Sequence, residues 1–221
     1  KRLIGWADVV HHNMRMKGAV KLGLGIENMR RINPEAVTSY VSAYGQLGER
    51  GNWPGYDSIF SALAGWEFEN AGEGNPPIFS RPGTMDVTAA QSCLVETLAG
   101  LYTKRVGKGA AHVETSLLGV AAFTQSELLI DEKGALTPTY HLNSDQTGFS
   151  PFHRIYRCRD GAWMALAAHQ EAQQAAVRSI FGGDEGEFTA LALARDAAEW
   201  VKAFEAAGED DDLVVFEDAM N

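Results

Sequence analysis

The chain has 221 residues, of which 45% are hydrophobic, and it carries a formal net charge of −10. This length and composition fit one folded core, or a large domain with part of a second, and exclude extensive disorder. Residues 184–221 contain twelve acidic and two basic side chains, which accounts for the whole net charge. The rest of the chain is balanced, so a phosphate-bearing ligand meets no net repulsion there, whereas a nucleic-acid interface has no support.

Cysteine and histidine usage argues against a metal site. The two cysteines, Cys93 and Cys158, lack metal-ligand spacing, which indicates a reducing, cytoplasmic setting. His11 and His12 are adjacent on a predicted strand, so they point to opposite faces and cannot easily share an ion. We therefore expect no metal.

The start of the chain resembles neither a signal sequence nor a natural N-terminus. It has no initiator Met, and residues 1–6 are typical of the end of a helix. No apolar run is long enough to span a bilayer. We expect an internal piece of a longer polypeptide and no membrane association.

The first 130 residues alternate short β-rich runs with helical ones, which predicts an α/β fold. Residues 131–152 are polar and rich in turn formers, as in a linker between domains. Two strand-like runs then flank Asp160-Gly161, a strong hairpin signal. The predicted strands are 9–12, 37–44 and 111–116, and the predicted helices are 28–32, 58–65, 87–106, 117–130, 171–180 and 187–207.

A lone carboxylate opens the long central helix. In GTMDVTAA, residues 83–90, Asp86 directly precedes the apolar positions of helical spacing, which predicts that it is the N-cap. There the helix dipole would favour the ionised carboxylate and keep it available as a nucleophile. Basic residues followed by Gly107 and Gly109 predict the C-terminus. The alternative is that Asp86 is only a cap.

Several motifs, in order, resemble one family. They are ADVV at residues 7–10, NMR at 13–15, YGQLG at 44–48, PGYD at 54–57 and GKGAAHVETSLL at 107–118. Together they resemble the family III CoA-transferases (the CaiB/BaiF family), which include formyl-CoA and carnitine CoA-transferases and α-methylacyl-CoA racemase. The resemblance implies the second part of a Rossmann-like large domain at 1–130 and the start of a smaller α+β domain at 153–221. It also implies an interlocked dimer.

The resemblance implies a chemistry and its nucleophile. Asp86 falls where the family's catalytic aspartate lies. Its carboxylate would attack an acyl-CoA thioester to give a mixed anhydride, and the CoA thiolate would return to form an aspartyl-CoA thioester. A carboxylic acid would then take the CoA. Backbone N–H groups at the helix start would help to hold the developing oxyanion. Coenzyme A is thus a substrate, and no metal is implied.

The family's CoA contacts carry over onto a small set of positions. In the family, three of these positions lie in a loop along the nucleotide, and one is a basic residue that meets a CoA phosphate. The other four belong to a second loop near the pantetheine and the thioester. The alternative is that the charges are solvated and the aromatic residue is packed. The positions are Asn13, Met14 and Arg15, then Lys21, then Pro54, Gly55, Tyr56 and Asp57.

Departures from the family pattern leave other readings open. Racemase members have a catalytic His where Tyr56 stands, which makes an acyl-CoA racemase less favoured. Met16 and Lys17 replace the usual Pro-Gly after Arg15. The N-terminal strand–helix units of the family lie outside this chain, so a second copy or a sister domain is the expected partner. Residues 73–77 and 145–148 resemble longer members with two fused copies. A noncatalytic CoA-binding or assembly half is therefore the alternative function.

Overall fold

The computed structural model describes residues 1–127, 132–133 and 141–207, together with the backbone of 214–217. The chain divides into two compact units. Lys1–Phe68 and Ile78–Thr139 make up the first unit, and Glu69–Pro77 and Tyr140–Asn221 make up the second. Among the described residues, no helix has the length and apolar character needed to cross a membrane.

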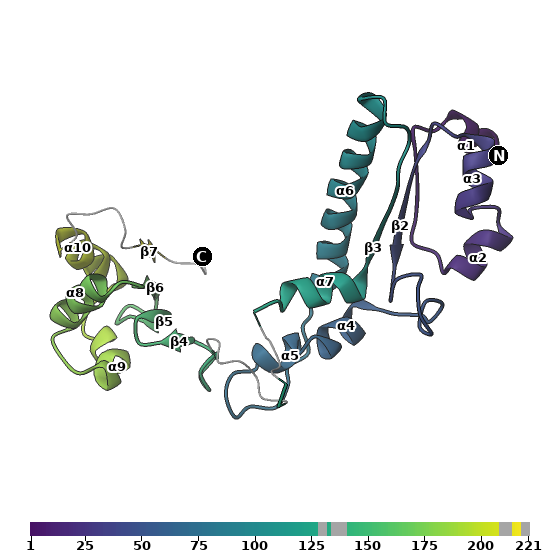
Figure 1. The fold of residues 1–221 in the computed structure, drawn as a ribbon. Coiled ribbons are helices and arrows are strands. Elements are labelled where there is room, and N and C mark those ends of the chain that lie inside the picture. Colours follow the sequence, from purple (N-terminus) through teal and green to yellow (C-terminus); the bar gives the residue numbers. More distant parts are fainter. Residues whose placement is uncertain (128–131, 134–140, 208–213, 218–221) are drawn as a thin grey trace. The chain divides into compact units, whose positions relative to one another are not determined.

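The first unit is built on a three-stranded parallel sheet in the order β1-β2-β3. Its central strand β2 is buried along almost its whole length, as expected for a parallel strand covered on both faces. The helix α6 runs alongside β2 and β3, and α3 lies on the other side of the strands (Figure 1). The elements are α1 (Arg2–Trp6), β1 (Val9–His12), α2 (Met16–Lys21), α3 (Ile26–Ile32), β2 (Val37–Ser42), α4 (Asp57–Leu63), α5 (Trp66–Glu69), α6 (Thr84–Arg105), β3 (His112–Ser116) and α7 (Leu117–Thr124).

The long helix α6 packs closely on the sheet and ends as predicted. A Cβ added to Gly100 would lie 2.9 Å from a methyl of Val37, so glycine is needed for this close approach. At the C-terminus Gly107 adopts a φ of 78°. Its N–H donates to Lys104 O, and the Lys108 N–H donates to Thr103 O, which is a Schellman motif.

Several predicted boundaries in the first unit were wrong. The helix α6 begins at Thr84 with Gly83 as its N-cap, so Asp86 is the third helical residue and not the cap. The strand β2 ends at Ser42, because the Ser42 hydroxyl accepts the Gly45 N–H and starts a turn. The helix predicted for 117–130 is α7, which ends at Thr124, and residues 128–130 lie outside the described part.

The second unit combines an antiparallel sheet, β4-β5-β6-β7, with helices. The predicted hairpin is confirmed, because β5 and β6 pair, but its turn is longer than the two residues predicted. The Cys158 N–H donates to Ala162 O, so residues 159–161 form the loop, in which Gly161 has a φ of 85°. The helix predicted for 187–207 is divided in two. The break occurs where the Arg159 side chain donates to Ala194 O and to the Asp196 carboxylate. Asp196 directly precedes α10, and its carbonyl accepts the Trp200 N–H. The elements are β4 (Gly148–Ser150), β5 (His153–Arg157), β6 (Trp163–Ala167), α8 (Glu171–Phe181), the 3-10 helix η1 (Glu185–Glu187), α9 (Phe188–Ala192), α10 (Ala197–Ala207) and β7 (Val214–Glu217).

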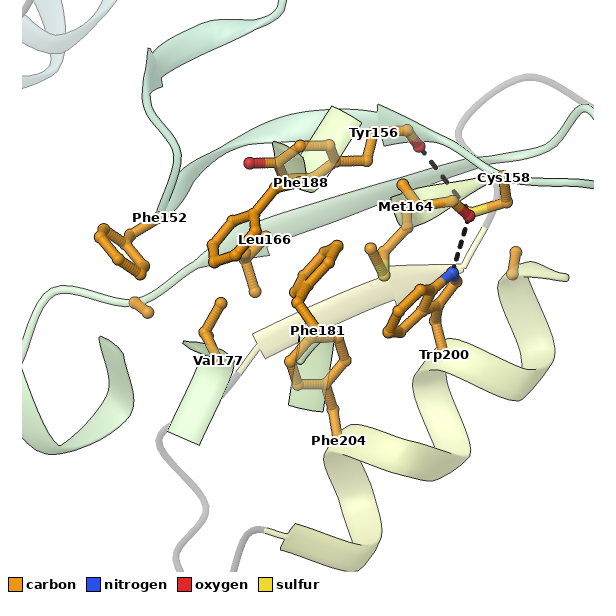
Figure 2. Close-up of a cluster of buried hydrophobic side chains, with 13 residues drawn as sticks. Phe152, Tyr156, Cys158, Met164, Leu166, Val177, Phe181, Phe188, Trp200 and Phe204 are labelled. Carbon is orange, nitrogen blue, oxygen red and sulfur yellow. Dashed lines mark hydrogen bonds between the residues drawn. The ribbon is translucent and has the colours of Figure 1, made fainter. Parts of the chain in front are cut away.

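An aromatic core holds the second unit together (Figure 2). Trp200 is 1% exposed, and its indole N–H donates to Ala192 O at 2.9 Å. Phe181 stacks on Trp200 with ring centroids 4.6 Å apart and on Phe188 at 4.4 Å. Phe204 and Met164 are also buried in this cluster. Burial of these large side chains is the main stabilising contribution to the unit.

The segment 131–152, expected as a linker, contains strand β4 and hydrogen-bonds to a distant stretch of the chain. The Glu73 N–H donates to Leu142 O at 2.8 Å, and the Gln146 side chain donates to Ala71 O at 2.9 Å. A Cβ on Gly72 would lie 2.2 Å from Asn143 O. Residues 69–77 therefore belong with the second unit, a long-range pairing that local composition does not reveal.

Candidate active site

The first unit contains a cavity of about 760 Å³, a volume typical of small-molecule sites. Its walls come from the first two strands, the helix α6 and the loop that leads to α4. Six of the residues singled out in the sequence line it: Asn13, Arg15, Pro54, Gly55, Tyr56 and Asp86. The fold thus brings together positions that are more than 70 residues apart in the chain.

Three other predicted residues do not line this cavity. Lys21 is exposed at the last turn of α2, and Met14 is half-buried. Asp57 is not among the lining residues, but its carboxylate accepts the backbone N–H of Asp86. The predicted residues therefore fall into two groups, six that line the cavity and three that do not.

Chain topology and one close contact explain how the cavity walls are placed. Asn13 and Arg15 directly follow β1, and the carboxyl ends of parallel strands are where α/β sheets form ligand crevices. In the loop that leads to α4, a Cβ on Gly55 would lie 2.5 Å from the Phe60 ring and 2.7 Å from Ala43 Cβ. Only glycine fits there. Tyr56, the next residue, is 71% exposed at the start of α4.

A second carboxylate supports the start of α6. Asp57 Oδ2 accepts the Asp86 N–H at 2.8 Å, and Asp57 Oδ1 accepts the Ser61 hydroxyl at 3.2 Å. Asp57 thus satisfies one of the free N–H groups of the helix N-terminus, the task that was predicted for Asp86. The Thr84 N–H is also engaged, by Pro82 O at 2.9 Å. These two N–H groups are therefore already engaged in hydrogen bonds within the protein.

The environment of Asp86 raises its carboxyl pKa, where the sequence predicted that the ionised form would be favoured. Partial desolvation is the larger cause, and the negative charge of Asp57 is the second. A higher pKa makes the carboxylate more basic and so a better nucleophile once it is ionised.

Replacing Asp57 separates its capping role from its charge. We expect Asp57→Ala to lower the free energy of unfolding by about 1 kcal/mol, because α6 loses its cap. Asp57→Asn should keep most of that stability, since the amide oxygen still accepts the Asp86 N–H. Both variants should lower the pKa of Asp86, because both remove a neighbouring negative charge. Urea unfolding and an NMR titration of the Asp86 carboxyl would measure these effects. Equal stability of the Ala variant and the wild type would refute the capping role.

Sequence reasoning missed a group of polar residues in the same cavity wall: His11, Ser39, Cys93 and Thr97. The signal was present in the helix, where Ala89, Cys93 and Thr97 recur at four-residue spacing. It was obscured because their partners lie on two separate strands. Within the described part of the chain, no group of three His, Cys, Asp or Glu residues is placed to hold a metal ion.

The class of protein follows from the match to a family model. Residues 1–213 match the model of CoA-transferase family III, and the chain belongs to this family. Solved structures agree on the fold. The Mycobacterium tuberculosis protein Rv3272 has a TM-score of 0.77 at 22% identity, over 100% of this chain and 62% of that one. A CaiB/BaiF family protein from Brucella suis has a TM-score of 0.71 at 18% identity, over 100% and 62% respectively.

Curated relatives carry several activities. The chain is 27% identical over 216 residues to the CoA-transferase/lyase DddD of Marinomonas sp. (strain MWYL1), covering 94% of this chain and 26% of the relative. It is 25% identical to the succinate–glutarate CoA-transferase of Agrobacterium fabrum, covering 82% and 45%. It is 27% identical to the human α-methylacyl-CoA racemase, covering 76% and 44%. The chain thus spans less than half of each of these relatives.

Proposed function

We propose that this chain supplies the CoA-binding, nucleophile-bearing part of an enzyme that moves CoA between an acyl-CoA thioester and a carboxylic acid. The observation that carries the proposal is that Asp86 lies in the wall of one cavity with Asn13, Arg15 and the loop ending at Tyr56. Family membership and the names of the transferase relatives add support.

The proposed reaction uses the Asp86 carboxylate twice. One oxygen attacks the thioester carbonyl carbon, the C–S bond breaks, and CoA thiolate leaves an aspartyl–acyl anhydride. The thiolate then attacks the Asp86 carbonyl carbon and expels the acyl group as a carboxylate. The acceptor carboxylate attacks the resulting aspartyl-CoA thioester, which releases CoA thiolate and forms a second anhydride. The thiolate then attacks the acyl carbon of this anhydride, which gives the new acyl-CoA and frees the Asp86 carboxylate. No net proton is taken up or released.

The proposed CoA contacts divide into inner and outer positions. Asn13, Arg15 and the loop from Pro54 to Tyr56 line the cavity, which suits the pantetheine arm and the adjoining nucleotide. Lys21 is exposed on α2 and is proposed to meet a phosphate from outside the cavity. Met14 is proposed to lie along the nucleotide with Asn13 and Arg15, and Asp57, which accepts the Asp86 N–H, is proposed to lie near the thioester.

A matched pair of basic residues tests CoA binding. Arg15→Ala should weaken binding of free CoA about tenfold, the loss of one charge-assisted hydrogen bond. Lys17→Ala removes an exposed charge two residues away that does not line the cavity, and it should leave the affinity almost unchanged. Calorimetric titration with CoA measures both. Equal losses in the two variants would mean that only general electrostatics attracts CoA.

A second polypeptide surface is proposed to complete the site. Apolar side chains of α6 remain exposed, including Val95 at 66% and Tyr102 at 66%. A second copy of the chain or a sister domain of the same polypeptide is the proposed partner for this face.

Both cysteines are free thiols, which supports the proposed cytoplasmic location.

The noncatalytic CoA-binding or assembly half stays the second candidate. In this alternative the same cavity holds CoA, and Asp86 serves only a structural role in the first turn of α6. CoA binding that depends on Arg15, without any transfer in the full-length protein, would select it over the transferase.

A further inference from the structure

A second cluster of reactive side chains lies in the cavity wall, away from the Asp86 carboxylate. Its centre is the Ser39 hydroxyl, which is 2.9 Å from His11 Nδ1, 3.0 Å from Cys93 Sγ and 3.0 Å from Thr97 Oγ1. Cys93 Sγ is also 3.8 Å from His11 Nδ1. All four residues line the cavity. A thiol, a hydroxyl and an imidazole thus form a continuous chain beside an open space.

The secondary structure fixes this arrangement. His11 and Ser39 are register partners on β1 and β2, so their side chains lie on the same face of the sheet. Cys93 and Thr97 are one turn apart on α6, the helix that covers this face. Cys93 is seven residues beyond Asp86, which places it about 10 Å further along the helix. The thiol is therefore too distant to take part in chemistry at Asp86.

The surroundings of Cys93 differ from those of the other cysteine. A thiol linked through a hydroxyl to an imidazole can lose its proton to that imidazole, and the thiolate is the reactive form. Cys158 lies in the aromatic core of the second unit, where burial raises its pKa to about 11. Cys93 is also buried, with 3% of its surface exposed, but it differs from Cys158 in lining the cavity and in having a proton acceptor within reach.

We propose that Cys93 is a covalent modification site that reacts with small organic disulfides entering the cavity. The Cys93 proton passes to His11 Nδ1 through the Ser39 hydroxyl. The thiolate attacks one sulfur of the disulfide, its S–S bond breaks, and a new S–S bond joins that sulfur to Cys93. The released thiolate takes the proton back from His11. The incoming disulfide is the oxidant, and one thiol is released for each site modified.

The test uses 2-hydroxyethyl disulfide on the reduced full-length protein under native conditions. Intact-mass analysis should show addition of one hydroxyethylthio group, peptide mapping should place it on Cys93, and a reducing agent should remove it. Cys158 in the same molecule is the internal control and should remain unmodified. Modification of Cys158 at the same rate as Cys93, or no modification of Cys93 before denaturation, would overturn the proposal.

Two histidine variants test the proton path. His11→Gln should slow modification at neutral pH by at least about tenfold, because the proton acceptor is lost. His169→Gln replaces an exposed histidine in the second unit and should leave the rate unchanged. An unchanged rate in His11→Gln would refute the relay through Ser39. These results are independent of transfer activity, so they neither require nor test the role proposed for Asp86.

Discussion

Asp86→Asn is expected to abolish CoA transfer while leaving the fold intact. The amide keeps the size and shape of the side chain but cannot attack a thioester, so the rate should fall by about a thousandfold or more. Steady-state assays of transfer between an acyl-CoA and an acceptor acid would measure this loss. Asp184→Asn makes the same change at an exposed site of the second unit and should retain full activity.

The same variant is expected to be at least as stable as the wild type at neutral pH. Because the folded state raises the Asp86 pKa, folding favours the protonated carboxyl. That stabilisation is present below the unfolded-state pKa and is lost as the pH rises through the folded-state value. The neutral amide avoids this loss. The gain should be under about 1 kcal/mol, since the carboxyl is partly exposed to solvent. Urea unfolding should show the gain at neutral pH and its disappearance in acid.

Trp200→Ala is expected to cause the largest loss of stability in the second unit. The indole is 1% exposed and packs against Phe181, so its removal leaves a cavity in the core. The cost should be about 3–5 kcal/mol in the free energy of unfolding, followed by circular dichroism in denaturant. Trp6→Ala is the control, because Trp6 is 84% exposed, and it should change stability by less than about 0.5 kcal/mol. Similar losses in both variants would contradict this description of the core.

Local signals in the sequence predicted several elements well. Asp160-Gly161 correctly marked the turn of the β5–β6 hairpin, since Gly161 supplies the positive φ that this turn requires. Gly107 marked the end of α6 for the same reason, because a φ of 78° strongly favours glycine. The alternation of strands and helices correctly indicated an α/β arrangement in the first unit.

Contacts between distant residues account for what the sequence did not predict. The start of α6 depends on Asp57, which lies 29 residues earlier and takes the role predicted for Asp86. The pairing of residues 69–77 with the second unit depends on backbone hydrogen bonds to Leu142 and its neighbours. The Ser39-centred cluster needs two strands and a helix to meet. Periodicity and turn residues carry no information on such long-range contacts.

The central claim is that Asp86 forms a covalent intermediate with CoA. The most direct measurement is mass spectrometry of the full-length protein after incubation with a panel of acyl-CoAs and trapping with hydroxylamine or borohydride. We predict a modification on the peptide that contains Asp86, absent from Asp86→Asn, and the reactive acyl-CoA would identify the donor. Turnover with Asp86 left unmodified, or a trapped adduct on another residue, would contradict the account.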